Sequence, residues 1–134
     1  MSAINCRNGL VTVLQTIDGL AVLPAERRSM QSNANAVVSF ATGTASYAGQ
    51  IKTRTWTFAV RVVIPMQDLV KAETILIEYV DRVTDAILAD LTLGGLANVT
   101  PAIAVGGEGD DGIYVVNGID YRSIVLRVDI RDKL

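Results

Sequence analysis

The chain has 134 residues, a formal net charge of −2 and a pI of about 5.0, with 50% hydrophobic and 19% charged residues. These values are typical of a folded protein with a sizeable core and exclude a disordered chain. The acidic balance disfavours non-specific binding of nucleic acid. No apolar run approaches the roughly 20 residues of a membrane-spanning helix, and residues 1–23 lack the charged-then-apolar order of a signal peptide. We therefore expect the protein to work in the compartment where it is made, the cytoplasm.

Histidine is absent, which removes the commonest general base and the commonest metal ligand. Cys6 is the only cysteine, so an internal disulfide and a zinc cluster of thiolates are excluded. Without the usual histidine base, we interpret Cys6 as a small apolar residue of an N-terminal helix rather than as a nucleophile. No carboxylates are paired at a recognisable catalytic spacing. We therefore expect neither an enzyme, nor a cofactor, nor a bound metal.

The first predicted element is an amphipathic helix that ends near Gly19. Its apolar side chains recur at three-and-four spacing: Ile4, Leu10, Val11, Leu14 and Ile17. A short strand, GLAVLP, follows it. Residues 25–35, AERRSMQSNAN, are polar and lack periodicity, so we expect an exposed loop there.

Two β segments come next and are predicted to form a hairpin. Residues 35–49 favour a strand of weak register, and residues 51–65 favour a long strand in which apolar and polar side chains alternate. One face would carry Trp56, Phe58, Val60, Val62 and Ile64, and the other Thr53, Thr55, Thr57 and Arg61. We predict that the front half of the second strand pairs with residues 37–48 and projects beyond the body of the protein.

A long amphipathic helix is predicted from Leu69 to Leu91, with Asp68 as its N-terminal cap. Its apolar stripe is Leu69, Ala72, Leu76, Tyr79, Val80, Val83, Ile87 and Leu91. The pair Gly94-Gly95 follows this helix. A phosphate-binding loop requires a strand, then glycines, then a helix N-terminus, so we interpret the pair as a helix end.

The last third of the chain reads as strand. Residues 98–105 lead into an acidic, glycine-rich loop at 106–112, and two strands then flank Asn117-Gly118, a strong two-residue hairpin signal. This element order predicts one α+β domain over residues 1–134. It would be a mostly antiparallel sheet with an N-terminal helix and one long helix packed on one face, plus an extended β-hairpin.

The loop at 106–112 concentrates three acids, Glu108, Asp110 and Asp111. Calcium requires six to eight oxygen ligands, with a further bidentate carboxylate downstream. Three closely spaced acids supply too few, so we interpret the loop as a solvated connection between strands rather than a metal site.

Two basic groups also have a plainer interpretation. Arg27 and Arg28 would suit a phosphate or an acidic partner, but exposed arginine pairs are most often ordinary surface. Lys52, Arg54 and Trp56 interleave base and aromatic as nucleic-acid platforms do. A single aromatic on an acidic chain favours instead a core residue, Trp56, at the base of the hairpin.

Two stretches, ILADLTLGGLANVTPAI and GIYVVNGIDYRSIVLRVDIRD, resemble the tail terminator (tail completion) proteins and related minor tail proteins of long-tailed bacteriophages. In that family an acidic helix end runs into a D-x-T-L-G-G turn, and the chain closes with an aromatic-bearing strand and an alternating hydrophobic one. The matching residues are Asp90, Thr92, Leu93, Gly94, Gly95, Tyr114, Tyr121 and residues 124–130. The N-terminal helix and the hairpin fit the same layout, so the resemblance covers nearly the whole chain apart from residues 25–35.

The resemblance implies a structural protein of the virion, in its tail or neck, assembled in the host cytoplasm. Such proteins form a ring, usually a hexamer, on the last ring of the tail tube. They end polymerisation and present a joining surface to the head. The implied partners are other copies of the chain, the tail-tube protein and the head–tail connector or neck proteins. DNA would pass through the lumen without specific binding, and no membrane is involved.

On this hypothesis the hairpin of residues 37–64 and the loop of residues 25–35 make subunit or tube contacts. The contact residues would be Arg27, Arg28, Tyr47, Lys52 and Arg54, and the acidic loop with Glu108, Asp110 and Asp111 would lie near the channel or an exposed rim. Two alternatives stay open. One is another neck or tail protein, such as a head-closure ring or a tail-tube subunit. The other is a non-viral ligand-binding α+β domain or a small carboxylate-based enzyme.

Overall fold

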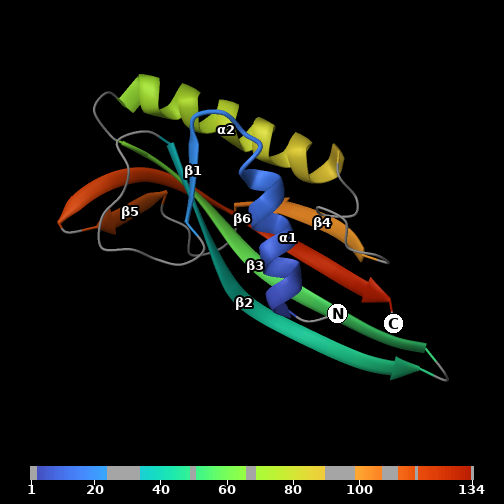
Figure 1. The fold of residues 1–134 in the computed structure, drawn as a ribbon. Coiled ribbons are helices and arrows are strands. Elements are labelled where there is room, and N and C mark those ends of the chain that lie inside the picture. Colours follow the sequence, from blue (N-terminus) through green and yellow to red (C-terminus); the bar gives the residue numbers. More distant parts are fainter. Residues whose placement is uncertain are drawn as a thin grey trace.

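In the computed structural model, two helices lie on one face of a six-stranded sheet, which confirms the predicted α+β class (Figure 1). The structure describes residues 3–23, 34–48, 51–65, 69–89, 99–106, 112–116 and 118–133. The elements are α1 (Ala3–Leu14), β1 (Leu20–Leu23), β2 (Ala34–Ala48), β3 (Ile51–Pro65), α2 (Leu69–Ala89), β4 (Val99–Val105), β5 (Ile113–Val116) and β6 (Ile119–Lys133). Within these ranges, neither helix is long and apolar enough to cross a membrane.

The sheet has the strand order β1-β2-β3-β6-β4, and β5 also pairs with β6. β1 runs parallel to β2, and every other pair is antiparallel. The predicted hairpin is confirmed: β2 and β3 pair from Asn35↔Val63 to Ala48↔Ile51. The predicted hairpin of the last two strands is confirmed as well, since Val116 pairs directly with Ile119.

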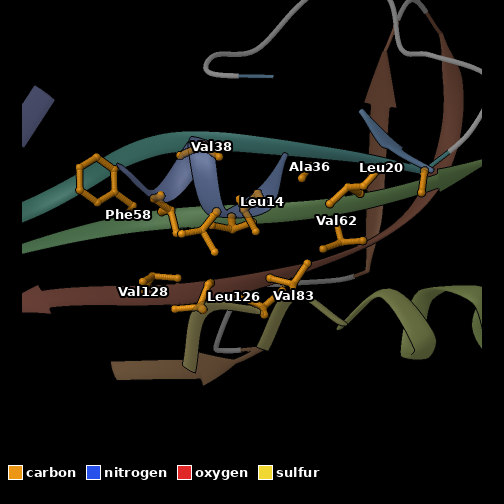
Figure 2. Close-up of a cluster of buried hydrophobic side chains, with 14 of the residues drawn as sticks. Leu14, Leu20, Ala36, Val38, Phe58, Val62, Val83, Leu126 and Val128 are labelled. Atoms are coloured by element: carbon orange, nitrogen blue, oxygen red, sulfur yellow. The ribbon is translucent and has the colours of Figure 1, made fainter. Parts of the chain in front are cut away.

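The core lies between the helices and one face of the central strands, as Figure 2 shows for a set of its buried side chains. Phe58, Val60 and Val62 of β3 are at most 1% exposed, and their partners on β6 include Leu126 and Val128 at 0%. Directly paired residues of antiparallel strands share a face, so the alternation in both strands directs one apolar row each toward the helices. The predicted inward face of residues 51–65 is therefore confirmed.

The long helix α2 buries the predicted stripe. Ala72, Leu76, Val83 and Ile87 are at most 2% exposed, and Tyr79 and Val80 are half-buried against the same core. α2 is described as far as Ala89, and the two further residues of the predicted helix are not. Asp68, Leu91 and the Gly94-Gly95 turn lie outside the described residues.

The helix α1 differs from the prediction in two respects. Cys6 and Leu10 are fully buried, as expected, but Ile4 is 61% exposed. The helix also ends at Leu14 rather than near Gly19. The amides of Thr16 and Ile17 donate to the carbonyls three residues earlier, and the Thr16 hydroxyl donates to the Val13 carbonyl at 2.7 Å. These bonds tighten the last turn, so the helix cannot continue to Gly19.

The predicted loop of residues 25–35 is wrong at its end. Ala34 and Asn35 belong to β2 and are buried, at 5% and 0% exposure. Ala34 pairs with Leu20 of β1, and Asn35 pairs with both Ala21 of β1 and Val63 of β3, so these residues belong to the sheet rather than to an exposed loop. The preceding residues, 24–33, lie outside what the structure describes.

Candidate assembly surfaces

The hairpin of β2 and β3 forms one end of the sheet (Figure 1). The sequence predicted that the front half of β3 projects beyond the body of the protein. In the structure β6 pairs with β3 as far as Thr53↔Lys133, so most of this half lies within the sheet. β6 is as long as β3, 15 residues each, so it accompanies β3 almost to the turn. Only the tip, from the pair Tyr47↔Lys52 outward, extends past the last β3–β6 pair.

The hairpin is bent by an irregularity in β2. The register shifts between Phe40 and Thr42, which leaves one extra residue on β2 and increases the local twist. Gly43 pairs with Trp56 just beyond this irregularity, and the Trp56 ring lies across it. A Cβ built on Gly43 would lie 2.4 Å from Trp56 Cε3, so glycine at this position lets the indole cover the strand.

An aromatic cluster lies on the helix face of the hairpin. The Phe40 ring is 5.7 Å from the Phe58 ring, edge-on, and 6.2 Å from the Trp56 ring, yet Phe40 is 54% exposed. The Arg54 guanidinium lies 5.8 Å from the Trp56 ring centroid, within cation–π range. Trp56 is half-buried against the core, in line with its interpretation as a residue at the hairpin base.

Beside this cluster is a hollow of about 200 Å³, which we call the aromatic hollow. It is lined by Ala3, Ile4, Arg7, Phe40 and Phe58. The N-terminal turn of α1 forms one wall, and the aromatic side chains of the hairpin form the other. The exposed position of Ile4 is explained by this arrangement, because α1 buries Cys6 and Leu10 against the sheet while Ile4 remains at the rim.

The opposite face of the sheet carries a second, smaller apolar cluster. Val37 and Val63 are buried against Tyr114 and Tyr121, which pair directly across β5 and β6. The Arg61 guanidinium lies 4.9 Å from the Tyr114 ring centroid. Neither α1 nor α2 lies on this face. The sequence pattern missed the cluster because residues 51–65 were expected to show only polar side chains here.

Further along this open face, the side chains are polar. The Thr57 hydroxyl donates to the Asp129 carboxylate at 2.6 Å. Arg127 and Arg131 of β6 are exposed on the same side, at positions paired with Ala59 and Thr55. This region therefore carries exposed arginines, threonine hydroxyls and one carboxylate, that of Asp129, which already accepts a hydrogen bond.

β4 and β5 both pair with β6, and the acidic loop comes between them in the sequence. The Gly106 amide donates to the Val125 carbonyl at 2.8 Å, and the Ser123 amide donates to the Gly112 carbonyl at 2.8 Å. β4 and β5 therefore lie one after the other along the same edge of β6. Glu108, Asp110 and Asp111 themselves lie outside the described residues.

Arg122 ties the base of this loop to α2. Its Nη1 donates to the carbonyls of Gly112, at 3.0 Å, and Ser123, at 2.7 Å. Its Nε and Nη2 donate to the Glu73 carboxylate at 2.8 and 3.3 Å, a two-point ion pair. Gly112 has φ +76°, a conformation that favours glycine, and a side chain there would displace the Arg122 guanidinium. No short-range sequence signal reports this link, since Glu73 and Arg122 are 49 residues apart.

We expect Glu73→Gln to lower the melting temperature slightly at pH values where Glu73 is ionised, and not at pH values where it is protonated. The Arg122 hydrogen bond and then its charge hold the pKa of Glu73 below the ordinary value of 4.5. This stabilisation is complete above the unfolded-state pKa and is lost as pH falls through the lowered folded-state pKa. The melting difference between wild type and variant should therefore shrink as the pH falls from neutral through the lowered pKa of Glu73. A difference that stays constant over this range would contradict the ion pair.

The structure brings three of the sequence-predicted contact residues to one end of the sheet. Tyr47 is the backbone pairing partner of Lys52 near the hairpin tip, two pairs from Arg54. Arg27 and Arg28 lie outside the described residues. In the part of the chain that is described, no three acidic or cysteine side chains converge as a metal site.

No protein-family model matches the chain, and no curated protein matches it. Its function is therefore inferred from the α+β fold and from the surfaces described above.

Proposed function

We propose that this chain is a structural subunit of a phage tail: a tail terminator. It assembles as a ring, a hexamer in the family it resembles, on the end of the tail tube. There it stops polymerisation and offers a joining surface to the head. The D-x-T-L-G-G sequence of residues 90–95 and the Tyr-bearing strand pair β5–β6 support this proposal, together with the element order.

The observation that carries the proposal is the number of large apolar side chains on outer surfaces. They lie 45–79% exposed on α1, the hairpin, α2, the end of β4 and the β5–β6 hairpin: Ile4, Phe40, Val70, Ile77, Leu88, Val105, Ile113, Val115 and Ile119. Exposed apolar residues scattered singly are normal, whereas residues that gather favour an interface. Ile4 and Phe40 line one hollow, and Ile113 and Val115 lie on one face of β5. A ring subunit stacked on a tube needs at least three such surfaces, two for its neighbours and one for the tube.

The form of the sheet supports the same function. The hairpin tip extends past β6, where it can reach a neighbouring molecule, and strand edges and hairpins are common sites of subunit contact. The net charge of −2 suits a channel through which DNA slides without binding.

The test is to add the purified chain to growing tail tubes and to measure tube length in negative-stain images. We expect a cap at one end of each tube and an end to growth. Tubes that keep growing without a cap would contradict the proposal. A tail-tube subunit would instead polymerise alone, a head-closure protein would bind the connector and not the tube, and a ligand-binding domain would ignore both.

A further inference from the structure

The helix α2 has a second apolar stripe on a side away from its buried one. Val70, Ile77 and Leu88 are 79%, 56% and 50% exposed. They are 7 and 11 residues apart, close to two and three whole turns, so they lie on one line along about 27 Å of helix. A helix with one buried face usually has a polar outer face. Here the outer face carries apolar side chains that the described part of the chain does not cover.

An acidic row runs beside this stripe. Glu78, Asp81 and Asp85 are all exposed and recur at spacings of three and four, so they share one flank of the helix. The basic residues of α2, Lys71 and Arg82, lie further around the helix, with the Arg82 guanidinium 5.1 Å from the Tyr79 ring centroid. At 100° per residue, Asp81 itself lies close to the line of Ile77 and Leu88. The outer surface of α2 therefore carries three separate apolar side chains beside an acidic flank.

The aromatic hollow has the complementary character. Ile4 and Phe40 form its apolar rim, and Arg7 is one of its lining residues. Arg7 donates at 3.3 and 3.4 Å to the side chain of its neutral neighbour Asn8, and no carboxylate of the described residues pairs with it. Arg54, over Trp56, adds a second positive charge on the same face of the hairpin.

We propose that these two surfaces bind each other between neighbouring copies of the chain. The outer stripe of α2 in one copy packs on the aromatic hollow of the next, with Ile77 near the Phe40 rim and the acidic row facing Arg7. This inference rests on the proposed function and adds to it the surfaces that join the ring.

The placement of the two surfaces suits a ring. The hollow lies at the N-terminal end of α1, which Figure 1 shows directed away from α2 and toward the hairpin. One subunit can therefore use both surfaces at once, each with a different neighbour. Contacts between two different surfaces generate a closed ring when the rotation closes, whereas one self-complementary surface would stop at a dimer.

A charge-reversal cycle tests the proposal, with assembly mass measured by light scattering over a dilution series. Arg7→Glu and Asp81→Arg should each shift ring dissociation to at least tenfold higher protein concentration. The double variant should regain most of the lost assembly, because the reversed charges attract again. Ile77→Asp should leave only lone subunits. Far-ultraviolet circular dichroism of each variant checks that the subunit is folded.

The matched control is Ile119→Asp, because Ile119 and Ile77 are equally exposed, at 56%, and Ile119 lies on the β5–β6 hairpin. It should leave the ring mass unchanged. The proposal is overturned if Ile77→Asp also leaves the ring intact, whether tube capping survives or not. A ring that survives but no longer caps tubes would show that α2 binds the tube instead. Both of those results leave the proposed function standing. A wild-type chain that stays a lone subunit even with tubes overturns both.

Discussion

Replacing Leu126 by alanine is expected to lower the free energy of unfolding by about 2–5 kcal/mol. Leu126 is 0% exposed in the middle of β6, opposite Val60, and belongs to the core cluster that α2 covers. The substitution removes buried methyl groups and leaves a cavity that neighbouring strands on both sides of β6 prevent from closing. Urea denaturation measures the loss, with both proteins at one concentration because oligomers gain stability by mass action.

The control for this substitution is Val115→Ala. Val115 is 57% exposed on β5, so its truncation removes little buried area and should change the unfolding free energy by less than about 0.5 kcal/mol. If Leu126→Ala were as mild as the control, the core would not lie between α2 and β6 as described.

Shortening the β2–β3 hairpin is expected to abolish tube capping while the subunit stays folded. Ala45 and Arg54 are directly paired, so replacing residues 46–53 by Asn-Gly joins them through a two-residue turn without changing the register below. The change removes the tip and only one β3–β6 pair, Thr53↔Lys133. Tube length in negative-stain images, with circular dichroism as the folding check, gives the result.

The matched control keeps the full hairpin and changes only its turn, Gly49-Gln50 to Asn-Gly. This variant should still cap tubes. Normal capping by the shortened variant would show that the tip makes no essential contact, and loss of capping by the control as well would assign the effect to the turn residues instead.

The local elements were predictable because their signals are local. The alternation from Trp56 to Ile64 and from Ile124 to Ile130, the α2 stripe and the Asn117-Gly118 turn each follow from a short-range period or a turn preference. The contact between Arg54 and Trp56 has the same local origin, because residues two positions apart lie on one face of a strand.

The rest depends on contacts between distant parts of the chain. Nothing in the order of residues places β6 between β3 and β4, or β1 parallel to β2. The aromatic hollow exists only once α1 is packed against the hairpin, and Ile4 is exposed for the same reason. The Arg122–Glu73 link likewise requires α2 to lie over the end of β6.

The central claim is that this 14.3 kDa chain is an assembly subunit that stops at one ring. Its solution mass, measured by sedimentation alone and after mixing with tail tubes, tests that claim most directly. We predict a single ring of subunits that does not grow into longer polymers and that sediments with the tubes. A lone subunit in both conditions would contradict the claim, as would open-ended polymers of the chain by itself.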